Sequence, residues 1–178
     1  MILEIVQYGD PVLRKKCALV EEVTDEIRAM VDDMLETMEE AHGIGLAAPQ
    51  IGRDIQLAVV DVSHDPGCVS YVRVDGEAVK LEEMMPLVFI NPTLKFGSEK
   101  ESMEEGCLSI HDIRAEVTRP LDVSAELTTL EGKKVTLETD GLLARAIQHE
   151  VDHLNGILFV DRVTSAAKLS VRRKLKKL

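Results

Sequence analysis

The sequence predicts a single domain of the α+β class, residues 1–178. Segments typical of strands gather in the middle of the chain, whereas segments typical of helices come before and after them. This order lacks the regular alternation of strands and helices that builds a doubly wound parallel sheet. A length of 178 residues also suits one domain with a sizeable core.

The N-terminal part of the chain is expected to be helical. Pro11 suits the first position of a short helical turn over 11–16. Across 24–43 apolar residues recur at helical spacing, which predicts a long amphipathic helix. Thr24 can cap its first turn, and Gly43 is expected to end it.

The middle of the chain is expected to consist mainly of strands. The glycine-rich stretch 43–52 suits neither a regular helix nor a central strand, because it also contains a proline. Strands are predicted at 55–62 and 87–94, and two turn signals within 63–86 indicate a hairpin excursion between them. Residues 123–141 alternate around a Glu-Gly turn and predict a further β-hairpin.

Two more helices are predicted towards the C-terminus. The first covers 141–155, with Asp140 or Thr139 as its cap and Gly156 beyond its end. The second is the tail 164–178, which holds six Lys and Arg and no acid. Such a tail is either a solvated helix end, whose cations suit the helix dipole, or a contact for an RNA-rich partner.

Composition excludes several classes of protein. The net charge of −11 disfavours non-specific binding of nucleic acid by the whole surface, and we expect no specific DNA partner. No apolar run has the length of a membrane span, and no secretory signal is recognisable, so we expect a cytoplasmic protein without a membrane partner. The odd number of cysteines, three, argues against a disulfide framework.

The stretch QHEVDH, residues 148–153, predicts a metal site. On a helix, His149 and His153 lie only ~40° apart around the axis and about 6 Å along it, so both imidazoles can reach one ion. Glu150 lies on an adjoining strip of the helix. That position suits proton transfer from a water molecule activated by the metal better than it suits metal binding.

A catalytic metal site needs a third protein ligand and keeps a fourth position open. After His153 the chain contains no His, Glu or Cys, so the third ligand is expected upstream. Cys107, which follows a glycine, is the best candidate, and His111 and Asp112 remain competitors. The other two cysteines are expected to be incidental.

Three stretches together resemble the peptide deformylase family: GIGLAAPQ at 43–50, EGCLS at 105–109 and QHEVDH at 148–153. All three are intact and in the family's order, and a weaker likeness covers most of the chain. The resemblance implies an α+β fold in which antiparallel and mixed sheets wrap around a central metal-bearing helix. It also implies hydrolysis of the N-formyl group of N-formylmethionyl nascent polypeptides, with release of formate.

The resemblance further implies one divalent metal ion, most often Fe2+, with Zn2+, Ni2+ or Co2+ as substitutes. It assigns the site residues as follows: metal binding by Cys107, His149 and His153, acid–base catalysis by Glu150, oxyanion stabilisation by the amide of Gln50 and the backbone N–H of Leu108, and substrate contact by Ile44, Gly45 and Gly106.

The chain departs from the family pattern in three places. His111 stands where the family usually has proline, and the excursion 63–86 is longer than usual. Arg145 stands on the metal-bearing helix where many relatives carry an apolar pocket residue. We expect its stem to pack on the methionine pocket and its charged head to reach solvent. These departures concern the substrate range.

Two other functions would share part of this pattern. Another metal-dependent peptidase or amidase would share the helix motif, but the downstream ligand that such peptidases use is missing. A non-enzymatic metal-binding protein would need a site closed by four protein ligands, often several cysteines, and would leave Glu150 without a role. If the protein is a deformylase, the basic tail suggests docking on the ribosome, where formylated chains emerge.

Overall fold

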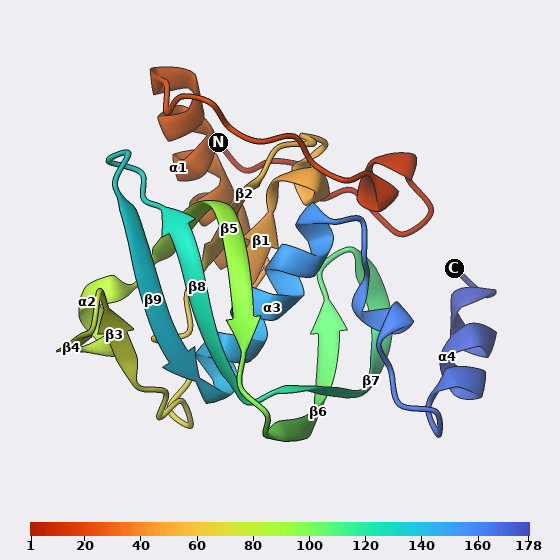
Figure 1. The fold of residues 1–178 in the computed structure, drawn as a ribbon. Coiled ribbons are helices and arrows are strands. Elements are labelled where there is room, and N and C mark those ends of the chain that lie inside the picture. Colours follow the sequence, from red (N-terminus) through yellow and green to blue (C-terminus); the bar gives the residue numbers. More distant parts are fainter.

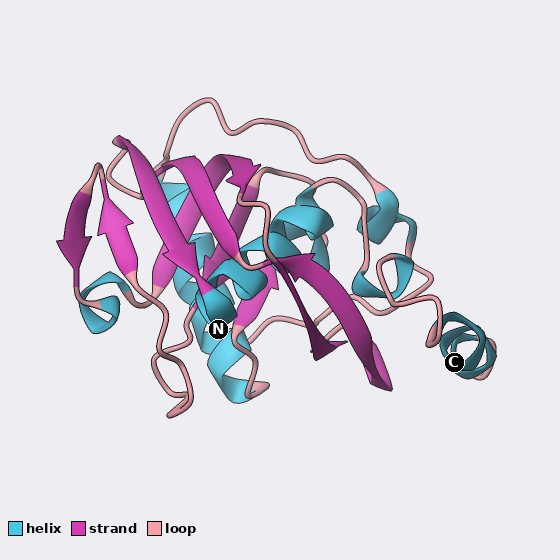
Figure 2. Ribbon diagram, turned by 60° about the horizontal axis from the view of Figure 1, so that its bottom comes forward, coloured by secondary structure: helices cyan, strands magenta, loops and turns pink.

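The computed structural model describes residues 1–178 and confirms the predicted α+β class. Helix α3 (Gly141–Leu154) lies at the centre, between a seven-stranded sheet and a separate two-stranded sheet (Figure 1). Figure 2 shows the same two sheets from a second direction. The helix that carries the QHEVDH motif is therefore the element around which both sheets are arranged.

The larger sheet is antiparallel throughout and has the strand order β1-β2-β5-β8-β9-β3-β4. Two alternate residues of β8, Ala125 and Leu127, are buried in the same cluster as Leu143 and Ile147 of α3. The helix is therefore held against the sheet by apolar contacts. The strands are β1 (Gly45–Ala47), β2 (Leu57–Val60), β3 (Val72–Val74), β4 (Glu77–Val79), β5 (Leu87–Phe96), β8 (Asp122–Thr128) and β9 (Lys134–Asp140).

Helix α1 (Asp25–Glu40) packs against β1 and β2. Its Met34 and Met38 lie in one buried cluster with Leu57 and Val59 of β2. All four residues of β2 are buried, because α1 and α3 contact this strand through two different clusters. Strand β1 is the edge strand next to it, so its outer edge is not paired within the sheet.

The start of α1 is as predicted, but its end is not. The Thr24 side chain accepts a hydrogen bond from the first turn, as an N-cap does. The helix ends at Glu40, and His42 rather than Gly43 adopts a left-handed conformation, with φ of 56°. Gly43 is needed for a different reason: a Cβ atom there would lie 2.6 Å from the side chain of Leu108.

The second sheet is the antiparallel pair β6 (Lys100–Cys107) and β7 (Ile110–Pro120). The sequence does not predict these strands, for two physical reasons. Most of β6 is exposed on both faces, so it shows no apolar alternation. In β7 the alternation is interrupted near Asp112, whose φ is 61°.

The remaining helices are short. They are η1 (Pro11–Arg14), η2 (Ala48–Ile51), α2 (Leu81–Met84), η3 (Phe159–Asp161) and α4 (Lys168–Leu175). Val171 of α4 is buried in a cluster with residues of β7. None of the helices has the length and apolar character that a membrane span requires.

The segment between β2 and β5 contains the hairpin β3–β4, and β3 extends the sheet by pairing with β9. Neither predicted cap residue caps α3 with its side chain. Asp140 accepts a hydrogen bond from the backbone N–H of Tyr71 at 3.2 Å, and Thr139 donates to the carbonyl of Tyr71 at 2.6 Å. The hydroxyl of Ser70 accepts instead from the backbone N–H of Leu143 at 3.2 Å. The cap therefore comes from the excursion.

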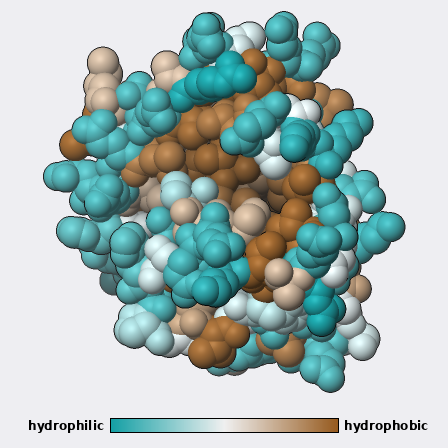
Figure 3. All heavy atoms as spheres, turned by 90° about the vertical axis from the view of Figure 1, so that its left-hand side faces the viewer, coloured by the Kyte–Doolittle hydropathy of each residue, from teal (hydrophilic) through white to brown (hydrophobic).

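Polar and apolar residues are unevenly distributed on the surface. On the face towards the left of Figure 1, apolar residues gather near the centre and hydrophilic side chains surround them (Figure 3). This pattern matches a chain in which 45% of residues are hydrophobic and 30% are charged. The catalytic candidates described next lie in a cavity beside α3.

Candidate metal centre

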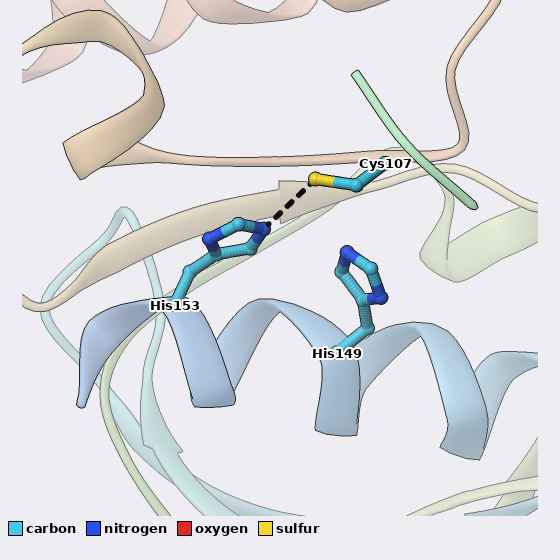
Figure 4. Close-up of side chains that lie close together, drawn as sticks. All are labelled: Cys107, His149 and His153. Carbon is cyan, nitrogen blue, oxygen red and sulfur yellow. Dashed lines mark hydrogen bonds between the residues drawn. The ribbon is translucent and has the colours of Figure 1, made fainter. Parts of the chain in front are cut away.

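The two histidines of the QHEVDH motif lie one turn apart on α3, with their ring centroids 5.1 Å from each other. Cys107 lies at the end of β6, next to an irregularity in the pairing with β7. Its Sγ is 3.4 Å from Nε2 of His153. Figure 4 shows both imidazoles projecting from α3 towards the thiol. One donor atom from each of the three residues lies within 4.8 Å of the others.

This donor set fits a divalent metal ion. One thiol and two imidazoles are ligands that zinc and similar transition metals accept, and three protein ligands leave a coordination position open. Nδ1 of His149 is hydrogen-bonded to Glu105 at 3.0 Å, which directs Nε2 towards the centre of the group. The competitors His111 and Asp112 are exposed and are not in the group.

The two imidazoles differ in their affinity for protons. Burial lowers the pKa of His153 well below the ordinary value for histidine, and the nearby His149 lowers it further. Burial also acts to lower the pKa of His149, but the carboxylate of Glu150 and the hydrogen bonds to Cys107 and Glu105 outweigh it, so this pKa is raised.

Glu150 lies beside the three donors and is only 4% exposed. Its Oε1 atom has no hydrogen-bond partner. Burial raises the pKa of this carboxyl to about 7, although the nearby His149 acts in the opposite direction. The edge strand β1 passes so close that a Cβ atom at Gly45 would overlap the Glu150 carboxylate. A glycine at this position therefore makes room for the acid.

Gln50 is 1% exposed and its side-chain amide is oriented from both ends. Its Oε1 accepts a hydrogen bond from the backbone N–H of Ala47 at 2.9 Å. Its Nε2 donates to the hydroxyl of Ser109 at 3.1 Å and lies 3.6 Å from Sγ of Cys107. The amide N–H group of Gln50 therefore points to the metal centre, although it comes from the other side of the cavity.

A cavity of about 470 Å³ opens beside these residues. Apolar side chains of Met103, Leu142 and Ala146 form part of its wall. His153 is not part of the cavity lining, since it lies deeper, at 1% exposure. The remaining predicted site residues all line the cavity: Ile44, Gly45, Gln50, Gly106, Cys107, Leu108, His149 and Glu150.

A buried ionic network adjoins the candidate metal-binding group through His149, and sequence reasoning missed it. Glu105 accepts hydrogen bonds from Arg119 at 2.6 and 2.9 Å, from Arg145 at 2.6 Å and from His149 at 3.0 Å. Burial alone would raise the pKa of Glu105, but the bonds from Arg119 and His149 hold it well below its usual range. Arg119 also donates to Asp152 of α3 at 2.9 Å.

The prediction for Arg145 was wrong. Its head does not reach solvent: the residue is 6% exposed, and its guanidinium is bonded to Glu105 and to two backbone carbonyls. One signal in the sequence could have indicated this. Arg145 and Asp152 are charged residues on a helix whose other positions are mostly apolar, and charges in such a setting are usually paired.

The comparisons with known proteins agree with this geometry. The family model described as polypeptide deformylase matches residues 2–169. A peptide deformylase of Methylacidiphilum infernorum is 43% identical over 178 residues, which are 100% of this chain and 93% of that protein. One from Rhizobium meliloti is 46% identical over 177 residues, which are 99% of this chain and 93% of that protein.

Solved structures give the same result. A crystal structure of a peptide deformylase from Synechococcus elongatus, in complex with actinonin, has a TM-score of 0.82 and 41% sequence identity. That match covers 98% of this chain and 85% of the other. A peptide deformylase structure from Thermotoga maritima has a TM-score of 0.78 and 34% identity, over 92% of this chain and 99% of the other. On these grounds, the chain belongs to the polypeptide deformylase family.

Proposed function

We propose that this protein hydrolyses the N-formyl group of N-formylmethionyl polypeptides and releases formate. The observation that supports this most directly is the content of one cavity. It combines a thiol and an imidazole of the metal group with a buried, protonatable carboxyl and an oriented amide. Hydrolysis of a formamide needs each of these: an activated water, a proton carrier and donors for the developing oxyanion.

Cys107, His149 and His153 would hold one divalent metal ion. When bound, the ion supplies Lewis acidity and a water molecule of lowered pKa. We propose Fe2+ as the physiological metal, with Zn2+, Ni2+ and Co2+ as ions that the same donors accept. Metal analysis of protein purified without oxygen tests this, and full occupancy by zinc with high activity would contradict the assignment of iron.

Glu150 is proposed as the general base and acid. Its carboxylate takes a proton from the attacking water and later gives one to the amine nitrogen as the bond from the formyl carbon to that nitrogen breaks. Formate and a free N-terminus are the products. In the metal-free protein, burial raises the pKa of this carboxyl to about 7, so both protonation states are accessible there near neutral pH.

The formyl oxygen becomes negative during the attack, and two donors are proposed for it. One is the side-chain N–H of Gln50, which its bonds to Ala47 and Ser109 hold in place. The other is the backbone N–H of Leu108, which follows the metal ligand Cys107. Removing one such donor typically costs about 3–4 kcal/mol of transition-state stabilisation.

Ile44, Gly45 and Gly106 are proposed to contact the peptide. Strand β1 lies at the edge of its sheet and lines the cavity, so a peptide backbone can pair with its free edge. The methionine side chain would then rest on the apolar wall formed by Met103, Leu142 and Ala146.

The test of this function is formate release from formyl-Met-Ala by the metal-loaded protein. An equivalent unblocked peptide is the control, since a peptidase would cleave it and a deformylase would not. Cleavage of the unblocked peptide without formate release would favour the alternative of a metal-dependent peptidase. Metal binding without either activity would favour a non-enzymatic metal protein.

We also propose that the protein works in the cytoplasm and docks on ribosomes through α4. The cations of the tail gather on a chain whose net charge is −11, and Arg173, Lys174 and Lys177 are exposed. Replacing these three by Gln keeps the buried anchor Val171. Co-sedimentation with ribosomes across a salt series should show weaker binding of this variant, and equal binding would rule out the tail.

A further inference from the structure

The three metal donors come from two elements that do not belong to one sheet. His149 and His153 are on α3, whereas Cys107 is on the β6–β7 hairpin, which has no strand pairing with the seven-stranded sheet. The distance from the thiol to the imidazoles therefore depends on the contacts that hold the hairpin against the helix.

Arg145 is the side chain of α3 that bonds both strands of this hairpin. It lies one turn before His149 on the helix. Its guanidinium donates to the carbonyl oxygens of Glu101 on β6 at 2.6 Å and of Val117 on β7 at 3.0 Å. It also donates to Oε2 of Glu105 at 2.6 Å. The planar guanidinium group thus joins the helix to two strands. A lysine ammonium group lacks this planar arrangement of donors and is poorly suited to the same contacts.

The same guanidinium acts on the metal ligand through Glu105. Oε1 of Glu105 is 3.0 Å from Nδ1 of His149, while Oε2 is shared by Arg145 and Arg119. Arg119 belongs to β7 and therefore bonds Glu105 within the hairpin. Arg145 reaches the carboxylate from the helix itself, so it fixes Glu105 relative to the element that carries the histidines.

Two further side-chain hydrogen bonds join the hairpin to α3. Arg119 donates to Asp152 at 2.9 Å, and Gln148 donates to the carbonyl of Pro120 at 3.0 Å. Both attach β7 alone. Of the two α3 side chains Arg145 and Gln148, only Arg145 also bonds β6, the strand that ends in Cys107.

We propose that Arg145 is a positioning residue for the metal centre. It sets the spacing between Cys107 and the two histidines and keeps Glu105 on His149, so that the three donors are arranged before the ion binds. This inference rests on the proposed metal site. Residues that orient metal ligands typically contribute 10–100-fold to metal affinity.

The experiment titrates metal-free protein with Co2+ and follows the cobalt absorption bands, including the thiolate charge-transfer band. We expect Arg145→Met to bind Co2+ 10–100-fold more weakly and to shift the bands, because the donors are no longer held at one spacing. Arg145→Lys keeps the charge but not the fork, so its Co2+ affinity should also fall, by a smaller factor. The lysine variant decides the question if the methionine variant does not fold.

The matched control is Arg162→Met. Arg162 belongs to the same ionic network and donates to Asp152 at 2.6 and 2.9 Å, but no bond joins it to Glu105 or to the hairpin carbonyls. This variant should melt at a lower temperature yet bind Co2+ within about threefold of the unaltered protein, which separates loss of stability from loss of preorganisation.

Folded Arg145 variants with unchanged Co2+ affinity and unchanged bands would overturn the inference. So would an equal loss of affinity in Arg162→Met, since that result would reflect general loosening of the network. Failure of the unaltered protein to bind Co2+ would instead overturn the proposed metal site, so the two failures are distinguishable.

Discussion

Replacing Glu150 by Gln should stabilise the metal-free protein at high pH while abolishing most of its activity. The pKa of Glu150 is about 7 in the folded protein, against an ordinary value of 4.5. The folded state therefore binds this proton more tightly than the unfolded state does. The tighter binding of this proton stabilises the folded state fully below pH 4.5, and this stabilisation is lost as the pH rises through 7.

The size of the effect follows from the same two values. Since one pKa unit corresponds to roughly 1.4 kcal/mol, the difference between 4.5 and about 7 amounts to about 3 kcal/mol of unfolding free energy at pH 8. Glutamine carries no charge at either pH and avoids this cost. For a chain of 178 residues, about 3 kcal/mol shifts the melting temperature by roughly 6–12 °C.

The assay is thermal unfolding of the metal-free protein at pH 5 and pH 8, together with formate release by the metal-loaded form. Glu150→Gln should melt close to the unaltered protein at pH 5 and well above it at pH 8. Its turnover should fall by about 10²–10⁴-fold, as expected for loss of a general acid–base group. Glu126→Gln, which replaces an exposed acid on β8, is the control and should show neither effect.

An equal change in melting temperature at both pH values would refute the reasoning about burial. Full turnover in the variant would refute the acid–base role of Glu150 separately, because that role does not depend on the stability argument.

Three further predictions concern the site and its support. Because the pKa of His149 is raised, metal binding must displace a proton, so the Co2+ affinity measured by titration should increase from pH 6 to pH 8. Gly45→Ala should reduce formate release at least tenfold, by displacing the Glu150 carboxylate, while metal content stays unchanged. Gly156→Ala should lower the unfolding free energy by about 2 kcal/mol or more, measured in denaturant, because φ is 74° and the new Cβ would lie 2.5 Å from the carbonyl oxygen of Arg14.

The parts of the site that are local in sequence were predictable. The spacing of His149 and His153 determines their geometry as soon as the segment is a helix, because side chains four residues apart share a face. Thr24, the strand at 55–62 and the hairpin at 123–141 follow from similarly local patterns. Cys107 was the best upstream candidate, since the chain has no His, Glu or Cys downstream of the motif.

The parts that depend on distant partners were not predictable in the same way. The buried position of the Arg145 side chain depends on hydrogen bonds to backbone carbonyls of β6 and β7. The sequence does not predict β6, because the strand is too exposed to show an apolar alternation. The cap of α3 comes from Ser70 in the excursion rather than from a residue next to the helix. In both cases the sequence contains the polar group, but only the folded chain shows its partner.

The two buried carboxyl groups beside the metal donors illustrate why such partners matter. Glu105 and Glu150 are both almost fully buried, and burial alone would raise the pKa of each. Glu105 receives four hydrogen bonds from Arg119, Arg145 and His149, so it stays ionised and can orient His149. Glu150 has an oxygen without a partner, so it exchanges a proton near neutral pH. The proposed division of roles between the two acids therefore depends on the arginines, which bond Glu105 and not Glu150. Arg119 and Arg145 would then influence the proposed chemistry although neither residue moves a proton.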